Sequence, residues 1–292
     1  MILVNGKRIK FTNFPNGETH VDTSFLNKLL IGDRVRVDFK YLSDSSIVKL
    51  LFVLGHLEFY TIGGRDIFIH YMPYSRMDRA QDGNCFSLLH VCKMLNRHIT
   101  SSDRVFVVEP HSDVTLRLLD NSARINMVTP LMNRILKLHP EINMICYPDK
   151  GAKNRFQDDT VKLPVVYCNK VRDFKTGEIL GLELDGTTDV SKRNILILDD
   201  LCSKGGTFYH TANKLKEHGA NNIYLGVCHM EETVKQGRIL QEYKNWDDVE
   251  ISPIKHIYCC NTMLEYVDFS GYTNITVFDL NLKEIKDGLN SL

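Results

Sequence analysis

Strand-like and helix-like patterns alternate along this 292-residue chain, and this order constrains the fold more than any other feature. Residues 34–42 alternate polar and apolar side chains as a strand does, and residues 43–60 carry apolar side chains at helical spacing. The run Asn-Ile-Leu-Ile-Leu at 194–198 is apolar enough for a strand buried on both faces. Further strands are predicted at 66–72, 104–108, 142–147, 163–168 and 222–228, and further helices at 85–96, 130–138 and 208–218.

This alternation predicts an α/β fold with mainly parallel sheets flanked by helices. The chain is long enough for two domains, each with its own core. The polar stretch at 120–129 is the predicted boundary, which gives an N-terminal domain over 1–128 and a C-terminal domain over 129–292.

Composition excludes several classes of protein. Acidic and basic residues balance at 36 each, so no net charge favours nucleic acid or an anionic membrane as a partner. No apolar run approaches the roughly 20 residues of a membrane-spanning helix, and the N-terminus lacks a signal-peptide pattern. The eight cysteines form no Cys-x-x-Cys pair, and several lie in apolar strands. We therefore expect a protein of the reducing cytoplasm.

The segment NILILDDLCSKGGT at 194–207 carries the strongest functional signal. In open α/β sheets, ligands bind beyond the carboxyl ends of the strands. Asp199 and Asp200 follow a buried strand there and can accept hydrogen bonds from vicinal sugar hydroxyls. The loop ending in Gly205, Gly206 and Thr207 then opens a helix, whose N-terminus attracts phosphate. The combination predicts a pentose-phosphate site, the alternative being an ordinary turn with a solvated Asp pair.

This segment resembles the phosphoribosyl-diphosphate motif of phosphoribosyltransferases and ribose-phosphate pyrophosphokinases. Six other segments are similar to pyrophosphokinase motifs, in the same order along the chain. They are FPNGE at 14–18, HYMPYSRMDR at 70–79, VVEPH at 107–111, PDKG at 148–151, KVR at 170–172 and NT at 261–262. Simple phosphoribosyltransferases have no counterpart to the first two. The resemblance implies two phosphoribosyltransferase-type domains and a diphosphate transfer from ATP to the C1 hydroxyl of ribose 5-phosphate.

The resemblance also implies roles for individual residues. Lys170 and Arg172 would act on the transition state from a loop over about 169–190, because cations neutralise charge on a transferring phosphoryl group. Mg²⁺ is the implied cofactor, with His111, Asp149 and Glu109 as the metal-site residues.

The two substrates are assigned to separate sets of residues. Phe14 would pack on the adenine of ATP, Asn16 and Glu18 would read its edge, and Arg76 and Asp78 would lie at its phosphates. The family completes this pocket from a neighbouring subunit, which implies a homodimer or a higher oligomer. The ribose-phosphate acceptor would lie against Asp149, Asp199, Asp200, Ser203, Lys204, Gly205, Gly206 and Thr207.

Departures from the family pattern leave the acceptor open. Lys150 and Lys204 add positive charge where the acceptor's 5-phosphate is expected. A 5-substituted ribose such as ADP-ribose, a precursor in NAD synthesis, is therefore the alternative acceptor. A non-catalytic regulatory paralogue is a further alternative, which the retained Lys170, Arg172 and His111 argue against. Phosphoribosyl transfer itself is the alternative that the sequence favours least.

Overall fold

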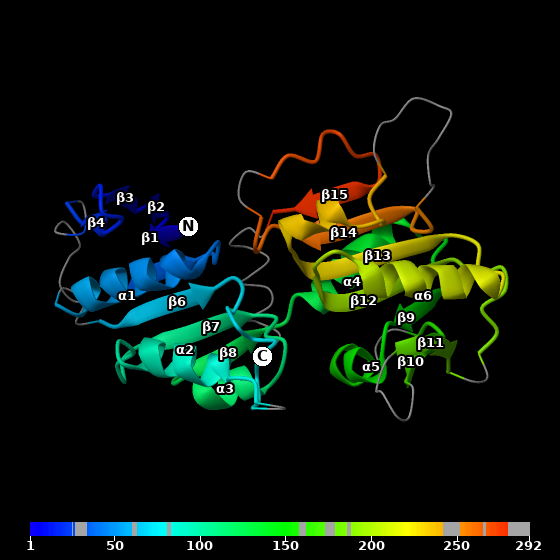
Figure 1. Ribbon diagram of the computed structural model, residues 1–292, viewed down its shortest axis with the longest axis horizontal. Helices are drawn as coiled ribbons and strands as arrows, with labels where there is room; N and C mark the ends of the chain where they lie inside the picture. Colours follow the sequence, from blue (N-terminus) through cyan, green and yellow to red (C-terminus); the bar gives the residue numbers. More distant parts are fainter. Residues whose placement is uncertain are drawn as a thin grey trace. The chain divides into compact units, whose positions relative to one another are not determined.

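The computed structural model describes residues 1–24, 26, 34–59, 63–80, 83–157, 162–172, 179–185, 188–241, 252–264 and 267–279. At 170–172 and 179–182 it describes the backbone but not the side chains. The chain forms two compact units, unit 1 (Met1–Ile125) and unit 2 (Asn126–Leu292) (Figure 1). This division falls close to the boundary predicted after residue 128. None of the described helices is long and apolar enough to cross a membrane.

Unit 1 is built on a six-stranded sheet in the order β2-β1-β5-β6-β7-β8. Strands β5 to β8 are parallel, and β1 pairs antiparallel with β5. A separate hairpin joins β3 to β4. The elements are β1 (Ile2–Val4), β2 (Lys7–Arg8), β3 (Lys10–Asn13), β4 (Thr19–Asp22), β5 (Val35–Phe39), α1 (Asp44–Glu58), β6 (Arg65–Ile69), α2 (Ser87–Asn96), β7 (Arg104–Val108), α3 (Val114–Leu118) and β8 (Ser122–Ile125).

Unit 2 contains a seven-stranded sheet in the order β11-β10-β9-β12-β13-β14-β15. All its pairs are parallel except β10 with β11. The elements are α4 (Val128–Leu138), β9 (Met144–Tyr147), α5 (Lys150–Phe156), β10 (Val165–Arg172), β11 (Ile179–Leu184), β12 (Ile195–Cys202), α6 (Gly206–Glu217), β13 (Ile223–Met230), the 3-10 helix η2 (Glu232–Gln236), β14 (His256–Cys260) and β15 (Ile275–Phe278).

Apolar periodicity explains how these elements pack. In α1, Ile47, Leu50, Leu54 and Leu57 recur at helical spacing and are buried against the sheet of unit 1. Every residue of β13 is buried, as expected for a central strand covered on both faces. The buried faces thus fix the two sheets in place, and several of the predicted site residues, such as Asp149 after β9 and Gly205 after β12, follow the carboxyl ends of their strands.

Part of one predicted loop is strand. Residues 169–190 were expected to form a loop, but Asn169–Arg172 belongs to β10 and pairs antiparallel with β11. The pairing shifts register between Val171 and Arg172. The Gly, Asp and Thr content of this stretch favoured a loop, whereas strand pairing satisfies its backbone hydrogen bonds.

Candidate active site

The loop predicted to bind phosphate, Ser203–Thr207, is called the phosphate loop below and runs from the end of β12 to the start of α6. Gly205 has φ +80°, and an added Cβ would lie 2.5 Å from Cδ1 of Ile239, so this position requires glycine. Gly206 and Thr207 form the first turn of α6 and are exposed. No side chain caps this 12-residue helix in the described part of the chain, so its first backbone N–H groups can bind an anion.

A second segment braces the phosphate loop and was not predicted from the sequence. The Ser203 hydroxyl lies 3.1 Å from the Thr233 hydroxyl, which donates to the Glu231 carboxylate at 3.1 Å. The N–H of Glu231 donates to the carbonyl of Cys202. Gly237 lies so close that a Cβ there would collide with the Lys204 carbonyl. The segment after β13 therefore fixes the backbone of the loop, while the Lys204 side chain is exposed.

Asp199 and Asp200 lie within β12 beside an arginine that sequence analysis missed. Nη2 of Arg155 is 3.4 Å from Oδ1 of Asp199 and 3.2 Å from Oδ1 of Asp200. Burial, and then the charge of Asp200, raise the pKa of Asp199 well above its ordinary value, and the Arg155 guanidinium opposes this rise. The two carboxyl groups are thus partly buried, they share the one Arg155 cation, and burial and mutual repulsion favour the protonated form of Asp199.

Asp149 is the N-cap of α5. Its Oδ1 accepts a hydrogen bond from the N–H of Ala152 at 2.9 Å, which satisfies one of the free donors of the first turn. Lys150 is exposed beside it. Lys170 and Arg172 lie on β10 opposite Leu182 and Ile179, and their side chains fall outside the described part of the chain.

In unit 1, the predicted adenine-contacting residues occupy the tip of the β3–β4 hairpin. Phe14 is 55% exposed, although an isolated phenylalanine is usually a core residue. The Asn16 amide donates to the Glu18 carboxylate at 2.8 Å, and the N–H of Glu18 donates to the Asn16 side chain. An exposed ring beside an ordered amide–carboxylate pair can stack on a planar ligand and recognise its polar edge.

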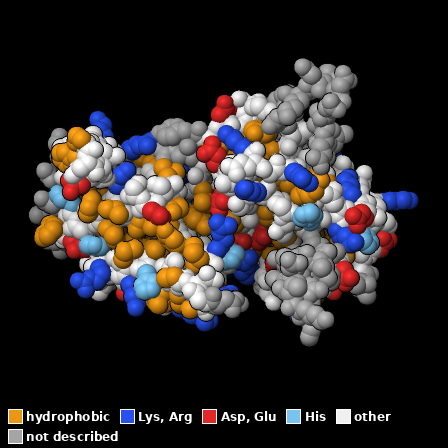
Figure 2. Space-filling model, in the orientation of Figure 1, with side chains coloured by type: hydrophobic (Ala, Val, Ile, Leu, Met, Phe, Trp, Pro, Cys, Tyr) orange, Lys and Arg blue, Asp and Glu red, His pale blue; other side chains and the backbone are white. Residues whose placement is uncertain are grey.

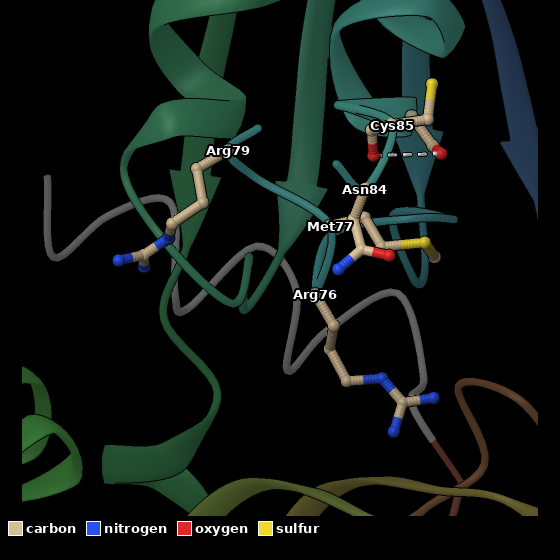
Figure 3. A pocket seen from close by; sticks show the side chains of 6 residues that line it. Arg76, Met77, Arg79, Asn84 and Cys85 are labelled. Carbon is tan, nitrogen blue, oxygen red and sulfur yellow. Dashed lines mark hydrogen bonds between the residues drawn. The ribbon is translucent and has the colours of Figure 1, made fainter. Parts of the chain in front are cut away.

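The segment after β6 forms a pocket of about 400 Å³, lined by Arg76, Met77, Arg79, Asn84, Cys85 and Ser87. Both guanidinium groups extend away from the loop backbone (Figure 3). The preceding Tyr74 has φ +63°, and the buried Ser75 hydroxyl has no hydrogen-bond partner among the described residues. Such strain and unsatisfied polar groups are concentrated at functional sites.

Asp78 lies at the same edge of unit 1 and keeps its charge. Burial opposes ionisation, but the hydrogen bonds from Arg79 and Ser112, and then the charge of Arg79, hold the pKa of Asp78 below its ordinary value. Glu109, with φ +38°, is buried with its carboxylate 4.0 Å from Arg124.

The described residues include no group of three or more His, Cys, Asp or Glu side chains that could hold a metal ion alone. Mg²⁺ usually takes one or two carboxylates and completes its octahedron with water and substrate phosphates. Asp149 and Glu109 each supply a carboxylate, so the donor chemistry of the predicted metal-site residues suits such an ion.

Comparison with known proteins finds relatives by sequence and by structure, but no family profile matches the chain. A ribose-phosphate pyrophosphokinase from Sulfolobus acidocaldarius is 27% identical over 232 residues, which cover 76% of each chain. Another from Pyrococcus furiosus is 28% identical over 228 residues, covering 76% of this chain and 77% of the relative.

A solved structure supports the fold. The crystal structure of phosphoribosylpyrophosphate synthetase from Mycobacterium smegmatis superposes with a TM-score of 0.76 at 19% identity, covering 97% of this chain and 90% of that one. The predicted α/β class and the resemblance predicted from the motifs are both confirmed.

Proposed function

We propose that this chain, a relative of the ribose-phosphate pyrophosphokinases over most of its length, transfers the diphosphate of ATP to the C1 hydroxyl of ribose 5-phosphate. The products are phosphoribosyl diphosphate and AMP. The observation that carries the proposal is the carboxylate pair Asp199–Asp200 followed by a phosphate loop at the open end of α6.

The acceptor binds to unit 2 through two kinds of contact. Asp199 and Asp200 accept hydrogen bonds from the 2- and 3-hydroxyls of the ribose. The backbone N–H groups around Gly206 and Thr207 hold the 5-phosphate, assisted by Ser203 and the positive end of α6. Fixing the sugar at both ends orients its C1 hydroxyl, and orientation is a large part of catalysis in phosphoryl-type transfer.

ATP binds to the residues of unit 1. Phe14 stacks on the adenine, Asn16 and Glu18 read its edge, and Arg76 binds the phosphates. Asp78, which lies two residues after Arg76, belongs to the same ATP site.

Transfer needs cations at the reacting phosphates. Lys170 and Arg172 stabilise the charge that develops in the transition state. Mg²⁺, when bound with ATP, neutralises the phosphate oxygens. His111 and Glu109 of unit 1 and Asp149 of unit 2 are the residues that would hold it, directly or through water.

Self-association and a cytoplasmic location complete the proposal. On α1, Val48 and Phe52 are 46% and 49% exposed, and Phe59 just after the helix is 84% exposed. Hydrophobic side chains gather over this part of unit 1 in Figure 2. Exposed apolar patches of this kind mark interaction surfaces, which favours a homo-oligomer. The eight cysteines are free thiols, as a reducing compartment requires.

The same chemistry on ADP-ribose is the second candidate function. Lys150 and Lys204 are exposed beside the acceptor residues. The Arg238 guanidinium lies 5.7 Å from the ring of Tyr209, in the first turns of α6. These groups favour an acceptor whose 5-position carries a second phosphate and a further ring.

Incubation with Mg-ATP and each acceptor in turn tests the proposal. We expect AMP and a C1-diphosphate of ribose 5-phosphate, identified by mass spectrometry. Turnover of ADP-ribose alone would assign the second candidate. If the protein neither hydrolyses ATP nor transfers diphosphate to either acceptor, that result would favour the non-catalytic paralogue.

A further inference from the structure

Arg155 lies outside every motif that points to this chemistry, yet it contacts the centre of the acceptor site. It belongs to the last turn of α5 and places one guanidinium nitrogen within 3.4 Å of Asp199 and 3.2 Å of Asp200. The Arg155 side chain is 24% exposed, and those of Asp199 and Asp200 are 16% and 4% exposed. Partial burial makes this three-membered contact stronger than a surface ion pair.

The helix that carries Arg155 is held at both ends. Asp149 caps its start, and the Tyr147 hydroxyl donates to the carbonyl of Phe156 at 2.9 Å. Phe156 is buried, and the Arg155 guanidinium lies 4.9 Å from its ring centroid. The backbone that presents the arginine is therefore fixed to the sheet.

Strand geometry explains why such a cation is needed. Consecutive side chains of a strand point to opposite faces, so Asp199 and Asp200 would diverge in a regular β12. When both groups are ionised, their like charges also repel each other, and burial strengthens that repulsion. A guanidinium that reaches both carboxylates offsets the repulsion and limits how far the two groups turn apart.

We propose that Arg155 is a positioning residue that holds Asp199 and Asp200 together, so that both carboxylates accept hydrogen bonds from the vicinal hydroxyls of one ribose. This inference rests on the proposed function of the same site. Arg155 acts through the two carboxylates and contributes to recognition of the acceptor rather than to the transfer step.

Three variants test the inference, with Lys153→Met as the matched control from the same helix. Lys153 lies 4.4 Å from the ring of Tyr167. Arg155→Met should raise the acceptor KM, and the Kd for ribose 5-phosphate by calorimetry, about tenfold or more, with kcat and the ATP KM nearly unchanged. Arg155→Lys should restore part of the loss, because lysine keeps the charge but not the planar fork.

Several results would overturn the inference. They are an unchanged acceptor KM in Arg155→Met, an equal loss in Lys153→Met, or a parallel rise in the ATP KM. Thermal unfolding of each variant shows whether a loss of acceptor binding comes from misfolding. If Arg155→Met is misfolded, the acceptor KM of Arg155→Lys decides the outcome instead.

A crystal structure of Arg155→Met separates this inference from the proposed function. If the wild type binds no ribose 5-phosphate, the proposed acceptor is wrong. The orientation of the two carboxylates in the variant still tests the contact itself. Divergence of Asp199 from Asp200 supports the positioning role, and unchanged positions reject it.

Discussion

Replacing Gly205 by alanine tests whether the phosphate loop depends on its left-handed backbone. At φ +80° a non-glycine residue costs about 1–2 kcal/mol. The new Cβ would also lie 2.5 Å from Cδ1 of Ile239, and such overpacking costs about 1–3 kcal/mol. We therefore expect Gly205→Ala to lower the free energy of unfolding by about 2–5 kcal/mol and to weaken acceptor binding.

Urea unfolding gives the free energies, and Gly206→Ala is the matched control. A Cβ at Gly206 meets no atom within 4 Å, so that variant should be neutral or more stable by about 0.5–1 kcal/mol. Ile239→Val removes Cδ1, so the double variant Gly205→Ala/Ile239→Val should lose less than the two single losses combined. Equal losses in Gly205→Ala and Gly206→Ala would refute the role assigned to the loop backbone.

Three further predictions concern catalysis, stability and acceptor choice. Lys170→Ala or Arg172→Ala should lower kcat about 100-fold or more with little change in the ATP KM, and steady-state kinetics with normal kcat in both would remove their catalytic role. Asp103→Asn leaves the buried Arg65 without its counter-charge and should cost about 3–5 kcal/mol in urea unfolding. Despite burial, Arg65 holds the pKa of Asp103 below its ordinary value, so this stabilisation is full above about pH 3.9 and is lost as pH falls through the lowered pKa. Lys204→Ala should weaken ADP-ribose about tenfold and ribose 5-phosphate less, and equal Kd changes for both would show that Lys204 does not discriminate.

Sequence patterns predicted the long elements because the helices bury one continuous apolar face and the central strands are apolar on both faces. The strands at 104–108 and 222–228 and the helices at 43–60 and 208–218 match β7, β13, α1 and α6 within a few residues. Strand β12 was predicted only to Leu198, because Asp199 and Asp200 interrupt the apolar run. Pairing with β13 nevertheless continues to Cys202. A backbone ladder depends on the neighbouring strand, which the local sequence does not encode.

The short N-terminal strands could not be predicted from the sequence. The contacts between distant residues that build the site could not be predicted either. Strands β1 to β4 span two to four residues each, too few for a periodic pattern. Arg155 lies 44 residues before Asp199, and Ser203 lies 30 residues before Thr233. Only folding brings these partners together. The motif residues themselves could be predicted because glycines and paired carboxylates at a strand end carry a local chemical signature.

The position of phosphorus atoms in the products tests the central claim most directly. ATP labelled separately at the α-, β- or γ-phosphorus should be incubated with Mg²⁺ and ribose 5-phosphate, and the products resolved chromatographically. Attack at the β-phosphorus predicts that α-label is found in AMP, while β- and γ-label both appear in the sugar product. Transfer of γ-label alone, with α- and β-label retained in ADP, would identify an ordinary kinase and contradict the diphosphate transfer proposed for this chain.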